Sequence, residues 1–130
     1  MFFFSFGGII TRGEGDTLIK KEFDGMNISL SSFISGIKAA ITRHDITAHD
    51  VANVNTPGYE EQVPHQVETK PAGTKISHIS RTPNQSTETS NTDLAEETKE
   101  QIVNKRALQA NARGIKVQDE MLGEVIDLLG

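Results

Sequence analysis

The sequence contains no cysteine and no tryptophan among its 130 residues. The lack of cysteine excludes disulfide bonds, thiolate metal sites, iron–sulfur clusters and cysteine nucleophiles. The longest strongly apolar run, residues 2–10, is about half the length that a membrane-spanning helix needs. The excess of 18 acidic over 13 basic side chains disfavours a general electrostatic attraction to nucleic acid or to an anionic membrane. The composition therefore predicts one soluble domain, with neither nucleic-acid binding nor membrane insertion.

Aromatic residues are scarce and concentrated near the start, because five of the six phenylalanines precede Met26. This front segment is a poor signal peptide, since no basic stretch precedes its apolar run and no small-residue cleavage site follows closely. It also fails as a phosphate-binding loop, because Glu14 stands where a lysine is required. We interpret residues 1–25 as an N-terminal extension that lies upstream of a second candidate start at Met26.

The remaining chain divides into three stretches of different composition. Residues 26–59 and 93–130 have apolar residues at helical spacing, whereas residues 60–92 hold three of the four prolines and ten serines or threonines. The predicted fold is mainly α. Two long terminal helices pair as an α-helical coiled-coil hairpin, and a short polar connector joins them.

The first helix is predicted to run from Leu30 to Val54, with Ser29 or Ser31 as its N-terminal cap. Its end is marked by the sequence Asn-Thr-Pro-Gly at residues 55–58, because proline disfavours the helical conformation before it and glycine permits a left-handed turn. The second helix is predicted to begin with a capping box. In this box Asp93 caps the helix and Glu96 reaches back to the N–H of Asp93.

Each predicted helix carries a heptad stripe, with gaps alternating between three and four residues. Such spacing keeps one side of a helix facing a neighbouring helix. Two helices in contact along one line enclose little core, so the isolated chain is expected to be marginally stable. The first stripe comprises Ile34, Ile37, Ile41, His44, Ala48 and Val51, and the second Leu94, Thr98, Gln101, Lys105, Leu108, Ala112, Ile115, Asp119, Leu122, Ile126 and Leu129.

Small residues recur beside the second stripe at Ala107, Ala110 and Gly114. One interpretation is that the helix simply tolerates this glycine. The other is that small side chains permit close helix–helix contact between subunits. The sequence leaves both open.

In the connector, residues 66–70 and 74–79 flank Pro-Ala-Gly at 71–73. This arrangement is typical of a β-hairpin, although an irregular loop fits the sparse apolar residues equally well. Residues 81–92 are rich in turn formers and expected to be mobile.

No group of residues has the spacing of a catalytic or metal site. Asp45 and His49 share a helix face, but no third ligand is nearby, so a solvated ion pair is favoured over a metal. His65 and His78 lie in the connector without a partner at fixed spacing. Nucleophile-elbow and zinc-protease motifs are both lacking. The sequence predicts no enzyme, no metal and no cofactor.

Two blocks of sequence resemble the bacterial flagellar rod and hook family. Residues 51–59 read Val-Ala-Asn-Val-Asn-Thr-Pro-Gly-Tyr, which is similar to the block that ends the N-terminal helix of these axial proteins. Residues 93–97, 106–112 and 119–123 are similar to their C-terminal helix. The chain departs from the family pattern at His49-Asp50, Thr98-Lys99 and Leu108, the first of these standing where the family has a small or polar residue and an asparagine.

The resemblance implies a short, proximal-rod-like structural subunit, because no inserted domain separates the two blocks. It implies export through the flagellar type III apparatus without a cleaved signal peptide, and assembly with copies of itself and with other rod and hook axial proteins. The implied location is the basal-body rod that spans the periplasm. The assembly and packing residues implied by the stripes and the resemblance are Ile34, Ile37, Ile41, Ala48, Val51, Asn53, Asn55, Pro57, Gly58, Tyr59, Leu94, Leu108, Ala112, Ile115, Leu122, Ile126 and Leu129.

A different class of function is a helical adaptor that does not polymerise and binds a partner in the basal body or export gate. The weakly apolar part of the second stripe between Leu94 and Leu108 motivates this alternative. A subunit is expected to gain helix as it polymerises, whereas an adaptor stays small.

Overall fold

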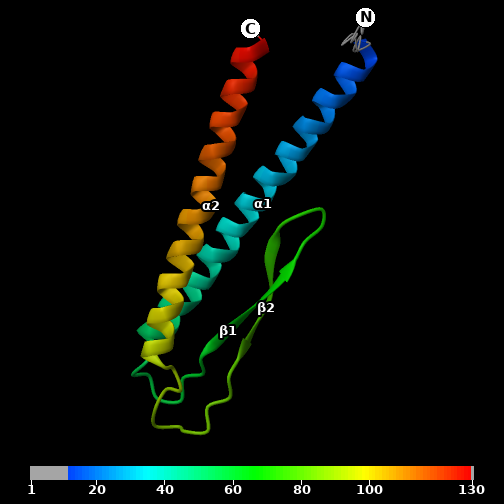
Figure 1. The fold of residues 1–130 in the computed structure, drawn as a ribbon. Coiled ribbons are helices and arrows are strands. Elements are labelled where there is room, and N and C mark those ends of the chain that lie inside the picture. Colours follow the sequence, from blue (N-terminus) through cyan, green and yellow to red (C-terminus); the bar gives the residue numbers. More distant parts are fainter. Residues whose placement is uncertain (1–11, 130) are drawn as a thin grey trace, which may run out of the picture.

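The computed structural model describes residues 12–129 and forms two long helices joined by a β-hairpin (Figure 1). Helix α1 covers Arg12–Ala52 and helix α2 covers Leu94–Leu129, with strands β1 (Gln62–Glu68) and β2 (Thr74–Arg81) between them. The predicted mainly helical architecture is confirmed, and of the two alternatives for the connector the β-hairpin is the one that forms. Coiled-coil pairing of the two helices stays a prediction. Within residues 12–129, neither helix has a stretch apolar enough to cross a membrane.

Helix α1 begins much earlier than predicted. It is 41 residues long, and residues 12–25 of the proposed extension are continuous with it, while residues 1–11 lie outside the described part. Ser29 and Ser31 are therefore interior residues, and the prediction that one of them caps the helix is wrong. Their hydroxyls donate instead to the carbonyls of Gly25 (3.0 Å) and Ile28 (2.8 Å), as serines within helices commonly do.

The predicted end of α1 is confirmed. The helix stops at Ala52, and Gly58 adopts a left-handed conformation with φ of 66°. The N–H of Thr56 donates to the carbonyl of Asn53, and the N–H of Tyr59 to that of Thr56. These tight turns reverse the chain, so that β1 runs back alongside α1.

The hairpin is longer than predicted, because β1 begins at Gln62 and β2 ends at Arg81. The strands are antiparallel, with an irregularity between His65 and Gln66. At the hairpin turn, Gly73 has φ of 129°, and a Cβ there would lie 2.5 Å from the hydroxyl of Ser35 on α1. The N–H of Thr74 donates to the same hydroxyl (3.1 Å), which fastens the hairpin tip to α1.

The two connector histidines have partners that sequence spacing did not indicate. His65 and His78 are cross-strand neighbours whose rings stack with centroids 4.2 Å apart. A two-residue period along each strand and the pairing register bring them together, which only the folded hairpin specifies.

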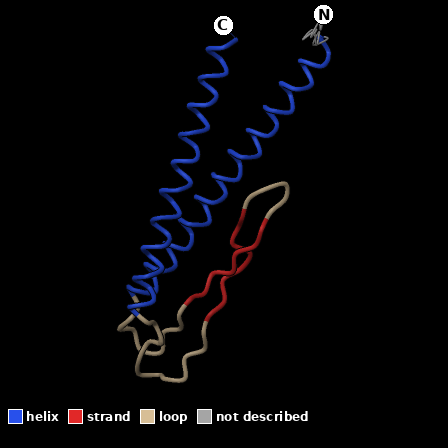
Figure 2. Tube along the Cα trace, viewed as in Figure 1, coloured by secondary structure: helices blue, strands red, loops and turns tan. Residues whose placement is uncertain are grey.

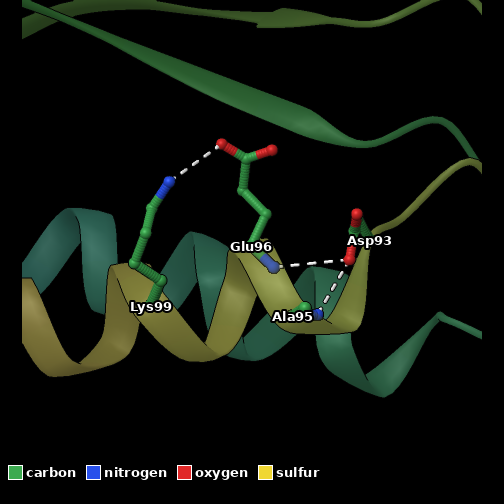
Figure 3. A network of polar contacts seen from close by, with 4 residues as sticks. All are labelled: Asp93, Ala95, Glu96 and Lys99. Carbon is green, nitrogen blue, oxygen red and sulfur yellow. Dashed lines mark hydrogen bonds and ion pairs between the residues drawn. The ribbon is translucent and has the colours of Figure 1, made fainter.

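The N-terminal cap of α2 is confirmed in part (Figure 3). The carboxylate of Asp93 accepts hydrogen bonds from the N–H groups of Ala95 (2.8 Å) and Glu96 (3.4 Å). The Glu96 carboxylate is directed toward Lys99, 3.4 Å from its Nζ, so the return half of the predicted capping box is not formed.

The helices lie close together near the connector and diverge toward the two chain ends (Figure 2). Among the described residues, the buried hydrophobic side chains are only Ala39, Ala40 and Ile46. The helices thus leave most of their apolar side chains partly or fully exposed.

Candidate assembly site

The contact between α1 and α2 is made mainly by small and polar residues, together with Phe33. The side-chain amide of Gln118 donates a hydrogen bond to the carbonyl of Met26. The hydroxyl of Thr47 hydrogen-bonds to the carboxylate of Glu97, and burial raises the pKa of this carboxylate. We call the inner stripes the residues that contact the other helix together with the buried residues that lie in line with them. They are Phe33, Gly36, Ala40, Arg43 and Thr47 on α1 and Glu97, Asn104, Asn111, Gly114 and Gln118 on α2.

Each of these inner-stripe positions lies one residue before a position of the predicted heptad stripes. On a helix, one residue corresponds to a rotation of about 100°. The predicted contact between the two helices therefore lies one residue later along each helix than the observed contact. Heptad spacing is present in two adjacent stripes on each helix. The two helices contact each other through the stripe that is richer in polar residues.

The predicted stripes, here called the outer stripes, remain largely on the surface. Ile34 is 40% exposed, Ile41 46%, Leu94 51% and Ile126 64%, and Ala48 and Ala112 are also exposed. Partly buried members are Ile37, His44, Val51, Leu108, Ile115 and Leu122, and Leu129 ends α2. These apolar side chains are available to another helix.

Two glycines allow the close approach of the helices. A Cβ on Gly114 would lie 2.5 Å from the ring of Phe33, and one on Gly36 would lie 2.7 Å from the side-chain oxygen of Asn111. Gly114 is thus needed for packing within the chain, a role that neither sequence interpretation of the small residues included. By contrast, a Cβ on Gly123 would meet nothing within 4 Å.

The inner stripes leave several buried polar atoms without a hydrogen bond. Asn104 is completely buried, and neither its side-chain oxygen nor its side-chain nitrogen has a partner. Nε of Arg43 and Oε1 of Gln118 are likewise buried atoms without a hydrogen-bond partner. Each unpaired buried group costs on the order of 1–3 kcal/mol, so the helix pair is a weakly favoured association by itself.

The outer stripes of the two helices border a common groove. His44 of α1 lies on one side, and Thr98, Gln101, Lys105 and Leu108 of α2 lie on the other, together with Ile102. No strand residue lines this groove in the described part of the chain. Three other grooves along α1 are bordered by the hairpin, whereas a groove between Met26 and Met121, nearer the chain ends, is also lined by the two helices alone. The groove between the outer stripes is thus a part of the helix pair that the hairpin leaves uncovered.

A second group of residues closes the end of the molecule near the connector. Asp50 is completely buried and accepts a hydrogen bond from the Tyr59 hydroxyl at 2.5 Å. The N–H of Gln62 also donates to the Asp50 carboxylate (3.2 Å to Oδ1). Asp50 thereby ties the end of α1 to the turn at residues 55–58 and to the start of β1.

Two asparagines connect the loop after β2 to the same turn. The side-chain nitrogen of Asn84 donates to the carbonyl of Tyr59 (3.0 Å), and the side-chain oxygen of Asn91 accepts from the N–H of Glu61 (2.9 Å). Asn91 also donates through its side chain to the carbonyl of Thr82 (3.0 Å). Residues 81–92 are expected from the sequence to be mobile, but Arg81 ends β2 and the loop that follows it makes specific hydrogen bonds.

Burial raises pKa values around Asp50. The pKa of Glu97 is raised to about 7, first by burial and then by the charge of Asp50. The pKa of Glu61 is raised by burial and then by Asp50, Glu96 and Asp93. That of Tyr59 is raised to about 12 by burial and by its hydrogen bond to Asp50. The closed end therefore concentrates negative charge in a poorly solvated place.

The other predicted site residues lie at the turn. Asn53 donates from its side chain to the carbonyl of His49 (2.8 Å) and accepts from the hydroxyl of Thr56 (3.2 Å). Asn55 and Pro57 are exposed. The His49 ring meets that of Tyr59 edge to face, with centroids 5.8 Å apart. Residues 12–129 contain no group of three potential metal ligands.

Sequence reasoning missed Asp50, Glu97 and the polar inner stripe of α2. A signal was present, because Glu97, Asn104, Asn111 and Gln118 recur every seven residues. Apolar residues mark a buried stripe more clearly than polar ones, so the sequence pattern favours the outer stripes. Asp50 departs from the family pattern, but its burial depends on Tyr59 and Gln62, which only the turn brings near.

Comparison with known proteins identifies the C-terminal part of the chain. Residues 84–128 match the family described as flagellar basal body rod FlgEFG protein C-terminal. This is a structural family rather than an enzyme family. No curated protein sequence matched the chain. The matched residues comprise the end of the connector loop and nearly all of α2, so the resemblance found in the C-terminal blocks is confirmed there. Through this segment, the chain is similar to the flagellar rod and hook family.

Proposed function

We propose that this chain is a structural subunit of the bacterial flagellar basal-body rod and polymerises through its terminal helices into an axial tube. The observation that carries the proposal is the exposure of the outer stripes. Ile34, Ile41, Leu94 and Ile126 are each at least 40% exposed, although they lie at heptad spacing on two long helices. Apolar stripes left open on a small protein are typical of surfaces that other subunits cover.

The weakness of the inner stripes favours the same function. The helix pair buries unpaired polar atoms of Arg43, Asn104 and Gln118, so packing within one chain stabilises it little. Contacts with other subunits are then the main source of stability, and folding is coupled to assembly. A head-to-tail contact that does not close produces a helical filament, as a rod requires.

The proposal extends to location and partners. The rod lies in the basal body, and its neighbours are further copies of this chain and other rod or hook axial proteins. Delivery by the flagellar export apparatus, without a cleaved signal, accompanies this role. The sequence block at residues 51–59 and the short connector, with no inserted domain, favour a proximal-rod-like subunit.

The second candidate is an adaptor that binds a basal-body or export-gate partner without polymerising. The polar lining of the groove, with His44, Thr98, Gln101 and Lys105, favours this function because such a groove discriminates between partners.

One experiment separates the two candidates. Circular dichroism and light scattering are recorded together over a range of protein concentrations. A rod subunit gains helical signal as particle mass grows, whereas an adaptor shows constant helicity and constant small mass. Detection of the chain in purified basal bodies, in many copies, would support the rod subunit directly.

A further inference from the structure

The outer stripe of α2 is interrupted by two charged residues of opposite sign. Lys105 and Asp119 stand at equivalent heptad positions, and both are exposed. In the described part of the chain, neither of these two side chains forms an ion pair or a hydrogen bond. A charge within a heptad stripe disfavours every helix pairing in which it meets an apolar residue or a like charge.

From this we infer that α2 docks in parallel against α2 of a second copy, displaced along the axis by 14 residues. The displacement corresponds to about 21 Å at 1.5 Å per residue. It places Lys105 of one copy at the level of Asp119 of the other. The inference rests on the proposed function and specifies the contact by which copies assemble.

The same displacement aligns the apolar part of the stripe. Leu108 comes level with Leu122, which sets two large apolar side chains against each other. Ala112 comes level with Ile126, which fills the space beside the small alanine. Ala112 and Ile126 are both exposed in the chain, and Leu108 borders the groove that the hairpin leaves uncovered. Apolar contacts and the charge pair therefore agree on one register.

Charges on the side of α2 that faces away from the outer stripe repeat the interval of 14 residues. Arg106 comes level with Glu120, and Arg113 with Asp127, and all four are exposed. The middle of α2 is thus predominantly basic and its C-terminal part acidic. Attraction between the two parts favours the displaced arrangement over an unshifted one.

Other pairings are disfavoured by the same residues. Without displacement, Lys105 meets Lys105 and Asp119 meets Asp119 of the second copy. A displacement of seven residues sets Lys105 against Ala112 and Asp119 against Ile126. An antiparallel pairing that aligns the two stripes sets Lys105 against Leu122 and Asp119 against Leu108. Each alternative leaves charges unpaired or opposed.

Disulfide cross-linking tests the displacement, because the chain has no cysteine of its own. Two full-length variants, A112C and I126C, are mixed, with one of them isotopically labelled, and oxidised mildly under assembling conditions. We expect disulfides between unlike chains and few between like chains. Disulfides formed by A112C alone would show an unshifted contact and overturn the inference, and so would assembly without cross-links between unlike chains.

Charge reversal provides an independent readout. K105D and D119K are each expected to weaken association by about tenfold or more, and the double variant K105D/D119K to recover most of that loss. K75D on β2 serves as the control and is expected to leave association unchanged. A double variant as weak as either single variant overturns the charge pairing. If wild-type copies do not associate at all, the proposed rod function fails as well, which is distinct from association in another register.

Discussion

The hydroxyl of Tyr59 donates a 2.5 Å hydrogen bond to the carboxylate of Asp50, a residue that has no exposed surface. Tyr59 ends the turn that follows α1, and Asp50 lies in the last turn of that helix. A buried carboxylate needs hydrogen-bond donors, and here the turn supplies them through Tyr59 and the N–H of Gln62. The direction in which the chain leaves α1 therefore depends on this pair.

Removing the hydroxyl with Tyr59→Phe is expected to destabilise the chain by about 2 kcal/mol, because the buried Asp50 carboxylate loses one of its donors and is left with the Gln62 N–H. Urea unfolding followed by circular dichroism measures the change. Asp50→Ala and the double variant complete a double-mutant cycle. The two single effects should not add. Full additivity would show that the hydrogen bond does not hold the turn.

The pH dependence of stability should reveal Glu97. Its pKa in the folded chain is about 7, above the ordinary value of 4.5, so the folded state binds the proton more tightly than the unfolded state. Its contribution to stability is complete below about pH 4.5 and is lost as the pH rises through about 7. Glu97→Gln is therefore expected to be more stable than the parent by on the order of 2 kcal/mol at pH 8 and nearly equal to it at pH 4.5.

Unfolding free energies of parent and variant from pH 4.5 to 8 test this prediction. All other ionisable groups are common to both proteins, so the difference between the two curves isolates Glu97. A constant difference across this range would contradict the assigned pKa.

Gly114 should not tolerate a methyl group, because a Cβ there would collide with the ring of Phe33. We expect Gly114→Ala to destabilise the helix pair by about 1–3 kcal/mol despite the better helix propensity of alanine. The matched control is Gly123→Ala, which meets open space and should stabilise α2 by about 0.5–1 kcal/mol. Thermal unfolding of both variants decides the matter, and equal gains in stability would contradict the close helix contact.

The buried side chain of Asn104 makes no hydrogen bond, so an apolar residue of similar size should suit the site better. Asn104→Leu is expected to stabilise the isolated chain by about 1–3 kcal/mol. Asn111→Leu is the control. It loses a hydrogen bond to the carbonyl of Ala107 and crowds Gly36, so it should destabilise the chain. Helicity at low protein concentration would rise for the first variant and fall for the second.

Local signals predicted much of the fold. The proline and glycine at residues 57–58 mark the end of α1, Asp93 marks the start of α2, and the Pro-Ala-Gly sequence makes a hairpin one of two alternatives for the connector. Each signal acts through the backbone of its immediate neighbours, so it can be read without tertiary structure. The start of α1 was missed because serines at positions 29 and 31 also fit a helix interior, where their hydroxyls bond to preceding carbonyls.

By themselves, then, the residues of this chain determine two helices with heptad spacing, a sharp turn after the first helix and a polar connector. The tertiary structure alone decided which side of each helix faces the other. Heptad spacing is satisfied equally by two adjacent stripes, and the choice between them depends on whether the two backbones can approach. Gly36 and Gly114 make that approach possible along the polar stripe, and the apolar stripe remains on the surface as a consequence.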